Sequence, residues 1–194
     1  MVMNGYAFRL ASEEDIPEIR ALYEPYVKNT AITFEVEVPS IEEFGNRIRS
    51  IAAEYPYIVC LSDRTIIGYA YAHRHMERAA YQWNAELSVY IGSRSQGRGI
   101  GKRLYAALMA ILELQNVKNV YGGVTSPNEK SEKLHESLGF TKLGTYRNTG
   151  YKCGAWHDVI WFEKAIGAYN LNPEPFMPIQ DVDRAAIAKI LEHS

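Results

Sequence analysis

Arg94-Ser95-Gln96-Gly97-Arg98-Gly99-Ile100-Gly101-Lys102 separates a strand-like run over residues 85–91 from a helix-like run over residues 102–114. Three of these residues are glycines within five positions, so the backbone can adopt positive φ and a ligand can approach the main chain closely. The N–H groups of such a turn, at the start of a helix, point one way and form a site for phosphate oxygens. The stretch therefore predicts a phosphate-binding loop between a strand and a helix of an α/β protein.

Two nucleotide-binding loops fit this stretch poorly. A Rossmann loop would follow the first strand and would need an acidic residue on the next strand, whereas about half of this chain precedes the glycines. The continuation Gly99-Ile100-Gly101-Lys102-Arg103 has neither the spacing nor the Ser/Thr of a Walker A loop. A glycine-rich turn with a purely structural role remains an alternative.

The residues Gln96 to Gly101 match the pattern Gln/Arg-x-x-Gly-x-Gly/Ala and resemble the pyrophosphate loop of the GNAT N-acetyltransferases. The resemblance implies that the cosubstrate is acetyl-CoA. The loop residues that would contact it are Gln96, Gly97, Arg98, Gly99, Ile100, Gly101 and Lys102. Arg94 and Arg103 could also face the phosphates, although for Arg103 a solvated position at the helix start fits equally well.

The composition is that of one globular domain with ordinary charge. Of 194 residues, 47% are hydrophobic and 23% are charged, and the net charge is −2. This balance does not favour a broad electrostatic contact with nucleic acid or an anionic membrane. Cys60 and Cys153 are the only cysteines, and no Cys/His cluster has zinc spacing, so we expect no disulfide framework and no metal. Met1 to Gly5 lacks the features of a signal peptide, and no apolar run is long enough to span a membrane, which predicts a cytoplasmic protein.

Apolar periodicity and turn residues predict a series of strands and helices. Helix starts are indicated by Ser12-Glu13-Glu14-Asp15, which resembles a capping box, and by Ser40 as an N-cap. The predicted elements are, in order, strand 6–10, a helix after residue 12, a connection over 31–38, a helix after residue 40, the hairpin 57–62 and 65–73, strand 85–91, helix 102–114, strand 119–124, helix 128–138, and the strand pair 140–151 and 155–163. This order, βααβββαβαββ, predicts a mixed sheet flanked by helices.

The predicted order also resembles the GNAT acyl-CoA N-acyltransferase fold. In that fold the strand before the glycine loop and the strand after its helix splay apart, and acetyl-CoA occupies the resulting V. Residues 1–165 would form the N-acetyltransferase domain. Residues 166–194 extend beyond it and are expected to end in a helix over 181–192, which either covers the domain or contacts a partner subunit.

Acetyl transfer to an amine needs a base, or a water-mediated path, that takes a proton from the ammonium form. Glu86 lies in a strand expected to be central, where a carboxylate is costly unless it is hydrogen-bonded or faces a cavity, and it is the predicted base. The alternative is a glutamate at a strand end, paired with Arg74 or Arg78. For Val89, Tyr90 and Ile91 the resemblance implies main-chain bonds to the pantetheine arm, with one N–H on the thioester oxygen.

The segment Asn128 to Phe140 matches the family pattern Asn-x-x-Ala/Ser-x-x-x-Tyr-x-x-x-Gly-Phe, with His135 where Tyr is usual. The resemblance implies that Asn128 and Ser131 contact the pantetheine. It also implies that residue 135 protonates the departing thiolate, a role that an imidazole can fill. The alternative for His135 is a position on the helix surface.

Three other segments narrow the resemblance: Thr33-Phe34-Glu35, Arg78 to Trp83, and Gly150 to Asp158. Together with His135 they resemble the phosphinothricin N-acetyltransferases and their relatives that act on methionine sulfoximine and sulfone. This implies a small anionic amino acid as the substrate. Its anionic groups would contact Arg74, Arg78 and Tyr81, and its apolar part would contact Phe34 and Trp83. Arg74 could instead neutralise Glu86, and Trp83 could belong to the core.

Two other classes of function stay open at this point. One is an acyl-CoA-binding module without turnover, and the other is an acetyltransferase that acts on protein N-termini or lysines. As partners we expect a small-molecule amine, neither nucleic acid nor membrane, and a second copy of the chain in a homodimer.

Overall fold

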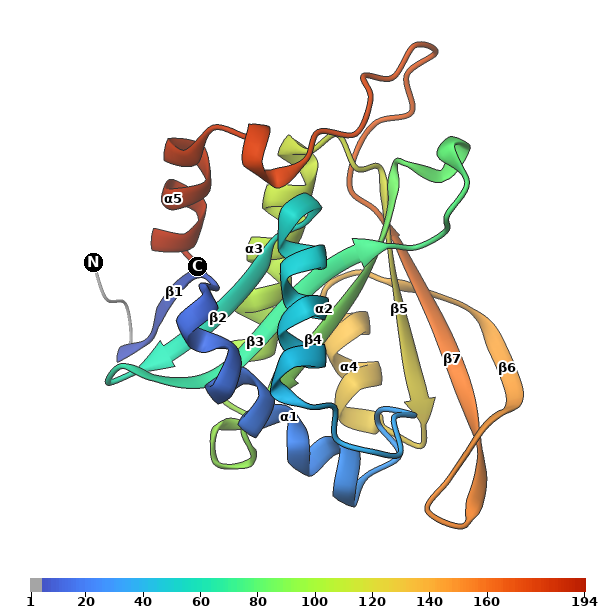
Figure 1. The fold of residues 1–194 in the computed structure, drawn as a ribbon. Helices are drawn as coiled ribbons and strands as arrows, with labels where there is room; N and C mark the ends of the chain where they lie inside the picture. Colours follow the sequence, from blue (N-terminus) through green and yellow to red (C-terminus); the bar gives the residue numbers. More distant parts are fainter. Residues whose placement is uncertain (1–4) are drawn as a thin grey trace.

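The computed structural model describes residues 5–194 (Figure 1). Residues 1–4 of the segment considered above for a signal peptide lie outside this description. The fold is built on a seven-stranded sheet in the order β1-β2-β3-β4-β5-β7-β6. The strands are β1 (Ala7–Leu10), β2 (Tyr57–Ser62), β3 (Thr65–Arg74), β4 (Asn84–Ile91), β5 (Asn119–Ser126), β6 (Thr141–Lys152) and β7 (Ala155–Ala165). Among the strands of residues 5–194, only β4 and β5 pair in parallel, so the expected mixed sheet is confirmed.

Helices cover both faces of the sheet, and the elements follow the predicted order (Figure 1). The α-helices are α1 (Ile16–Asn29), α2 (Ile41–Glu54), α3 (Ile100–Leu114), α4 (Glu129–Ser137) and α5 (Arg184–Glu192). One apolar core lies between the sheet and α1 and α2, and a larger one lies between the sheet and α3. Sheet and helices therefore form three layers, and the two cores fix the position of β4 from both sides.

Capping boxes precede the first two helices: the predicted one at Ser12 lies in the 3-10 turn Glu13–Asp15 directly before α1, and the predicted N-cap Ser40 is part of a second one at α2. At α2 the Ser40 side chain accepts a hydrogen bond from Glu43 N–H, and the Glu43 carboxylate accepts one from Ser40 N–H. Before α1, the buried Asp15 carboxylate accepts hydrogen bonds from Ser12 N–H and from both terminal nitrogens of Arg9. The Arg9 hydrogen bonds hold the pKa of Asp15 at about 2.

Several elements differ by a few residues from the predicted bounds. Helix α3 begins at Ile100 rather than at residue 102, because Gly99 takes the left-handed conformation directly before it and ends the loop. Strand β5 runs to Ser126, two residues further than predicted, because its register with β7 continues to the pair Ser126 and Asp158.

The C-terminal extension lies on the domain through backbone and side-chain contacts. Met177 N–H donates to the carbonyl of Gln115 at the end of α3, and the Gln115 side chain donates in turn to the carbonyl of Met177. The last helix, α5, contacts β1 and α3. At the chain end, the Arg103 side chain donates to the Ser194 carbonyl oxygen.

Candidate active site

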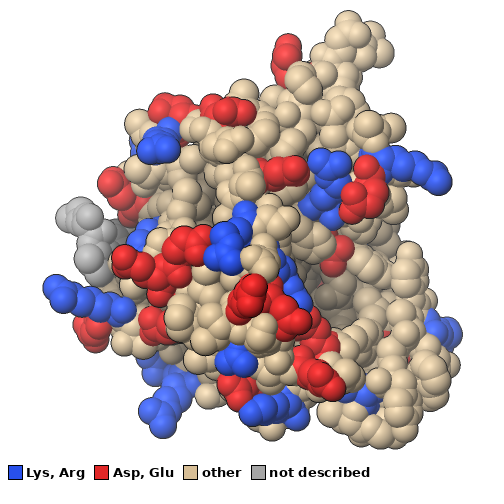
Figure 2. Space-filling model, in the orientation of Figure 1, with Lys and Arg blue, Asp and Glu red and all other residues tan. Residues whose placement is uncertain are grey.

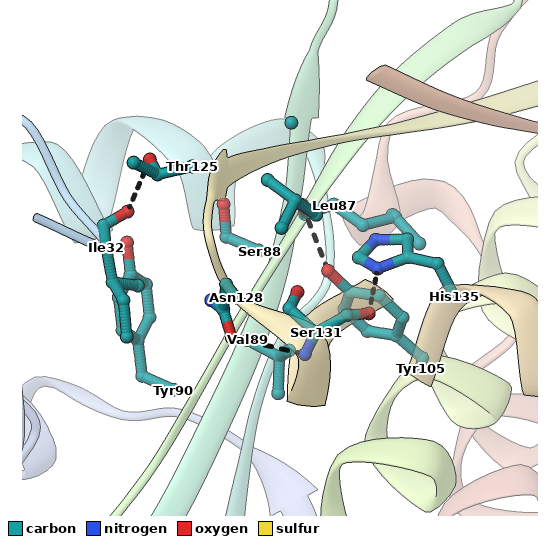
Figure 3. Close-up of a pocket in the computed structure, with 12 residues that line it drawn as sticks. Ile32, Leu87, Ser88, Val89, Tyr90, Tyr105, Thr125, Asn128, Ser131 and His135 are labelled. Atoms are coloured by element: carbon teal, nitrogen blue, oxygen red, sulfur yellow. Dashed lines mark hydrogen bonds between the residues drawn. The ribbon is translucent and has the colours of Figure 1, made fainter. Parts of the chain in front are cut away.

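The central feature of the site is the point where β4 and β5 separate. The two strands pair only from Asn84 to Glu86 on β4 and from Asn119 to Tyr121 on β5. Beyond Glu86, β4 continues without a β5 partner, and a cleft opens between the strands. The residues that line it are Ile32, Leu87, Ser88, Val89, Tyr90, Tyr105, Gly123, Val124, Thr125, Asn128, Ser131 and His135 (Figure 3).

The glycine loop lies at the carboxyl end of β4 and leads into α3. Gly97 and Gly99 have φ of 75° and 77°, the left-handed region that glycine adopts without strain. A Cβ at either position would meet nothing within 4 Å, so the space above both residues is open. The first N–H groups of α3 have no partner within the helix. The loop therefore fits a phosphate group at the helix start.

The polar side chains of the loop differ in their contacts. Arg94, Arg98 and Lys102 are exposed. The Gln96 amide donates to the Tyr26 hydroxyl and accepts from Lys130, which ties the loop to α1 and α4.

The sequence suggested two positions for Arg103, facing the ligand phosphates or solvated at the start of the helix. Its side chain occupies neither position. Its guanidinium lies 4.6 Å from the centre of the Phe8 ring on β1 and bonds the chain end. It therefore stabilises the packing of β1 and α5.

The β4 residues after Glu86 alternate between the two faces of the sheet. Val89 packs with the α3 core, whereas the Tyr90 ring lies among Tyr23, Tyr26 and Tyr69. Because its ring is enclosed there, Tyr90 can contact a ligand in the cleft mainly through its backbone. The backbone of Ile91 already exchanges hydrogen bonds with the Tyr26 hydroxyl.

Helix α4 presents two of the predicted cofactor residues at the other wall of the cleft. Asn128 caps the helix, and its side chain accepts a hydrogen bond from Ser131 N–H at 3.3 Å. Ser126-Pro127, directly before the cap, is a cis peptide bond. Both Asn128 and Ser131 line the cleft, within the same cavity as Val89 and Tyr90 (Figure 3).

His135 lies one turn after Ser131 and is 2% exposed, so the surface alternative is excluded. Its ring stacks on Phe162 and meets Phe140 edge-on. Nδ1 is 2.8 Å from the Ser131 carbonyl oxygen, while Nε2 is buried without a hydrogen-bond partner. Burial lowers the pKa of His135, which favours the neutral imidazole.

Tyr105 is a cleft residue that the sequence analysis missed. It lies on α3, its hydroxyl donates to the Leu87 carbonyl at 3.2 Å, and its ring meets His135 edge-on (Figure 3). Burial raises the pKa of Tyr105. The only signal in the sequence was a phenol on the apolar face of the helix, a pattern that core tyrosines share.

Glu86 lies on the face of the sheet opposite Leu87, at the last pair before the strands separate. Its side chain is 23% exposed. The carboxylate is 3.3 Å from Nδ1 of His75, a residue in the connection between β3 and β4. The alternative partners Arg74 and Arg78 do not bond Glu86, because Arg74 pairs with Glu54 at 3.4 Å and Arg78 is exposed.

The loop between α1 and α2 lies over the β6–β7 hairpin and carries Phe34. A Cβ on Gly150 would lie 2.4 Å from the Phe34 ring, so this contact requires glycine. The Lys152 side chain donates to the Thr33 carbonyl at 2.8 Å, and burial lowers the pKa of this lysine. Glu35, beside Phe34, pairs with Arg47 of α2. Lys152 and Glu35 were missed as site candidates because only the tertiary contact brings the loop and the hairpin together.

The remaining predicted substrate residues lie in or beside the connection between β3 and β4. Tyr81 is 38% exposed in a short 3-10 turn over Ala79–Tyr81. The Trp83 indole donates to the Glu174 carbonyl at 2.8 Å and thus contacts the C-terminal extension. No hydrogen bond or ion pair within residues 5–194 joins Arg74, Arg78, Tyr81 or Trp83 to Glu86.

Acidic and basic side chains are intermixed on the face shown in Figure 2, which is hollowed to the right of centre. Over the described part of the chain, no group of three or more His, Cys, Asp or Glu side chains has an arrangement that could hold a metal ion. In the same residues, no helix combines the length and the apolar character needed to cross a membrane.

Comparison with known proteins shows the family to which this chain belongs. The model of the acetyltransferase (GNAT) domain matches residues 8–161. Phosphinothricin N-acetyltransferase of Streptomyces viridochromogenes is 32% identical over 174 residues, which cover 90% of this chain and 94% of that protein. The L-methionine sulfoximine/L-methionine sulfone acetyltransferase of Salmonella typhimurium is 27% identical over 80% of this chain and 91% of its own length.

A solved structure agrees with the sequence relatives. The phosphinothricin acetyltransferase of Sinorhizobium meliloti in complex with AcCoA superposes with a TM-score of 0.84 at 30% identity, and the alignment covers 90% of this chain and 98% of that one. The predicted family, fold and acetyl-CoA cosubstrate are confirmed. The chain with the splayed strands, the glycine loop and the capped α4 belongs to the GNAT acetyltransferases, enzymes that use acetyl-CoA.

Proposed function

We propose that this enzyme transfers the acetyl group of acetyl-CoA to the α-amino group of a small anionic amino acid, such as phosphinothricin or methionine sulfoximine or sulfone, by direct attack in a ternary complex. The observation that carries the proposal is the position of Glu86. It is a partly exposed carboxylate on the face of the sheet opposite α3, at the last β4–β5 pair before the cleft. The names of the relatives from Streptomyces and Salmonella support the substrate class.

The cofactor-binding role falls to the loop, β4 and α4. Acetyl-CoA supplies the activated thioester, and its phosphates fit the open space above Gly97 and Gly99. The N–H groups at the start of α3 and the side chains of Arg98 and Lys102 would bind these phosphates. Asn128 and Ser131 would hold the pantetheine from the opposite wall, against the unpaired edge of β4.

Glu86 would take the proton that an alkyl ammonium must lose before its nitrogen can attack a carbonyl carbon. A carboxylate at the edge of the cleft can receive that proton directly or through one water, and the Glu86 side chain is partly exposed to solvent. His135 would serve the departing thiolate at the other side of the cleft. The proposed base thus lies on β4 and the proposed acid on α4, on different sides of the cleft.

The substrate would bind on the face of the sheet that carries Glu86, between Glu86 and the loop that carries Phe34. Phe34 is held against Gly150, which gives the site a fixed apolar wall. Arg78 and Tyr81 lie on the connection that leads into β4, and their exposed side chains could turn toward an anionic group. Arg74, the last residue of β3, would have to leave its ion pair with Glu54 to do the same. Trp83 would support this connection through its bond to Glu174.

A homodimer is part of this proposal. The β6–β7 hairpin exposes large side chains on its surface, among them Tyr146, Tyr151 and Trp156, each at least 59% exposed. A cluster of this kind is typical of a contact with another protein surface. A second copy of the chain would cover these side chains. A cytoplasmic location, where acetyl-CoA is available, stays a prediction.

Thiol release from acetyl-CoA in the presence of single amines tests the proposed function. We expect turnover with phosphinothricin, methionine sulfoximine and methionine sulfone, and much lower kcat/KM with their decarboxylated analogues. Peptides with free N-termini and histone-like lysine peptides form the second arm. Preferred turnover of peptides would support the protein N-acetyltransferase alternative, and binding of acetyl-CoA without thiol release from any amine would support the silent binding module.

Glu86→Gln provides the direct test of the base. We expect kcat to fall by about 10²–10⁴-fold and the acidic limb of the pH–rate profile to disappear. Affinity for acetyl-CoA, measured by calorimetry, should be nearly unchanged because Glu86 does not line the cleft. An unaltered pH–rate profile would assign the base role to another group or to solvent.

A further inference from the structure

The imidazole of His75 is fixed in place by contacts from three strands. Its Nδ1 lies 3.3 Å from Glu86 Oε2 on β4. Its ring stacks on Tyr121 of β5, with centroids 4.3 Å apart and planes 13° from parallel, and meets Trp161 of β7 edge-on at 5.5 Å. The His75 side chain is only 14% exposed although it lies in the connection after β3. A loop residue with this set of partners is held in one orientation.

The direction of the hydrogen bond follows from the chemistry of the two groups. An ionised carboxylate only accepts hydrogen bonds, so Nδ1 of His75 carries the hydrogen and donates it to Glu86. A donor that bonds the charged form of a carboxylate favours that form. It also restricts the carboxylate to one rotamer, which matters for a base that must meet a proton at a defined place.

We infer that His75 is a positioning residue that orients the Glu86 carboxylate for proton removal from the amine. Tyr121 and Trp161 hold the imidazole, and the imidazole holds the carboxylate. The inference rests on the proposed role of Glu86 as the base. It adds a residue that does not line the cofactor cleft and acts only through Glu86.

Other charged and titratable groups surround the pair, and the test must separate them from His75. His73 lies opposite Glu86 in the β3–β4 register, but its Nδ1 bonds the Arg74 carbonyl. The remaining groups near the pair are Tyr71 on β3, Tyr121 on β5, Glu163 opposite Tyr121 on β7, and the Arg47–Glu35 ion pair near Tyr71. Among these, His73 is the same residue type on the same face without the bond to Glu86.

Two substitutions at position 75 separate hydrogen bonding from packing. His75→Phe keeps an aromatic ring on Tyr121 but removes the donor, and His75→Gln keeps an amide donor but removes the ring. The readout is kcat/KM against pH for the amino acid substrate. For His75→Phe we expect the acidic limb to move to higher pH by about 0.5–1 unit, because the carboxylate loses a donor that favours its charged form. For His75→Gln we expect the limb to stay close to that of the wild type.

Matched measurements make the outcome decisive. His73→Phe should leave the limb in place, and thermal unfolding of all variants should show that each is folded. A limb that stays fixed in His75→Phe, or that moves equally in His73→Phe, would overturn the role of His75. Glu86→Gln, measured in parallel, tests the base itself. If Glu86→Gln abolishes the acidic limb while the His75 variants do not move it, the proposed function stands and this inference fails.

Discussion

The imidazole Nδ1 of His135 lies 2.8 Å from the carbonyl oxygen of Ser131, one helical turn earlier in α4. A carbonyl oxygen can only accept, so Nδ1 carries the hydrogen and Nε2 of the neutral ring bears the lone pair. Nε2 is buried without a partner beside Gly122. The neutral ring can therefore accept a proton at Nε2, and it must do so before it can donate a proton from Nε2 to a thiolate.

The lowered pKa of His135 predicts a pH-dependent stability. The folded chain binds a proton at His135 less readily than the unfolded chain, whose histidine has a pKa of about 6.5. The contribution of His135 to the free energy of unfolding is thus fully present above pH 6.5 and is lost as the pH falls below that value. The difference in free energy of unfolding between wild type and His135→Gln should therefore shrink from pH 7.5 to pH 5.5.

A second histidine provides the control for this measurement. His193 makes the same kind of bond, from Nδ1 to the carbonyl of Lys189 four residues earlier, but it is exposed. His193→Gln should leave the pH dependence of unfolding unchanged. Equal pH dependence of wild type and His135→Gln in urea unfolding would contradict the prediction.

Gly122 on β5 is expected to tolerate no side chain because of His135. A Cβ at this position would lie 2.3 Å from Nε2, so the His135 ring, which packs against Tyr105, Phe140 and Phe162, would have to shift. We expect Gly122→Ala to lower the free energy of unfolding by about 1–3 kcal/mol through overpacking. Gly123, the next residue, faces the other way, and its Cβ would meet Trp161 at an ordinary 3.5 Å. Gly123→Ala should therefore change the stability much less in the same denaturant titration.

The sequence predicted the elements of the fold because each carries a local signal. The capping boxes at Asp15 and Ser40 and the glycines before Ile100 depend on residues within a few positions of each other. The separation of β4 and β5 was implied only by the resemblance to a known fold. That their pairing is parallel and ends at Glu86 was not predicted, since no local pattern encodes where two strands separate.

The site was less accessible to sequence reasoning because much of it forms by tertiary contact. Pairing of Glu86 with Arg74 or Arg78 was the alternative to its role as the base, but His75, between these two residues in sequence, reaches the carboxylate instead. Sequence spacing does not predict which residue of a connection without secondary structure will face a neighbouring strand. The burial of Lys152 likewise depends on the docking of Thr33, more than a hundred residues away.

Gly99 is expected to be essential for cosubstrate binding. It holds φ at 77° and leaves open space where a phosphate would approach. Gly99→Val strains the backbone and fills this space, so we expect the affinity for CoA to fall by at least about tenfold. Gly154, in the turn between β6 and β7, has φ of 79° and is equally open, but it lies outside the loop. Gly154→Val should leave CoA affinity in calorimetry unchanged, and unchanged affinity in a folded Gly99→Val variant would disprove the assignment.

Gln115 should contribute strongly to holding the C-terminal extension on the domain. This fully buried side chain donates to the carbonyls of Glu54 and Met177 at 2.7 and 2.8 Å. Gln115→Leu leaves both carbonyls without their donor, and we expect the free energy of unfolding to fall by about 1–3 kcal/mol. Limited proteolysis should then cut first within residues 166–183. The exposed Gln180 offers the control, because Gln180→Leu should change neither stability nor cleavage.

The catalytic role of His135 can be decided by single-turnover kinetics. A neutral imidazole at the cleft can take at Nε2 the proton that the attacking nitrogen gives up and pass it to the departing thiolate. We expect His135→Ala to slow the chemical step by about 10²-fold or more at saturating substrates. His135→Tyr should restore part of the rate, because a phenol is the usual donor at this position in the family that the sequence resembles. Its recovery will be limited by Gly122 and Phe162, between which a longer ring must fit. Equal single-turnover rates for wild type and a folded His135→Ala variant would remove His135 from the proton path and leave Tyr105, whose hydroxyl bonds Leu87 in the same cleft, as the next group to test.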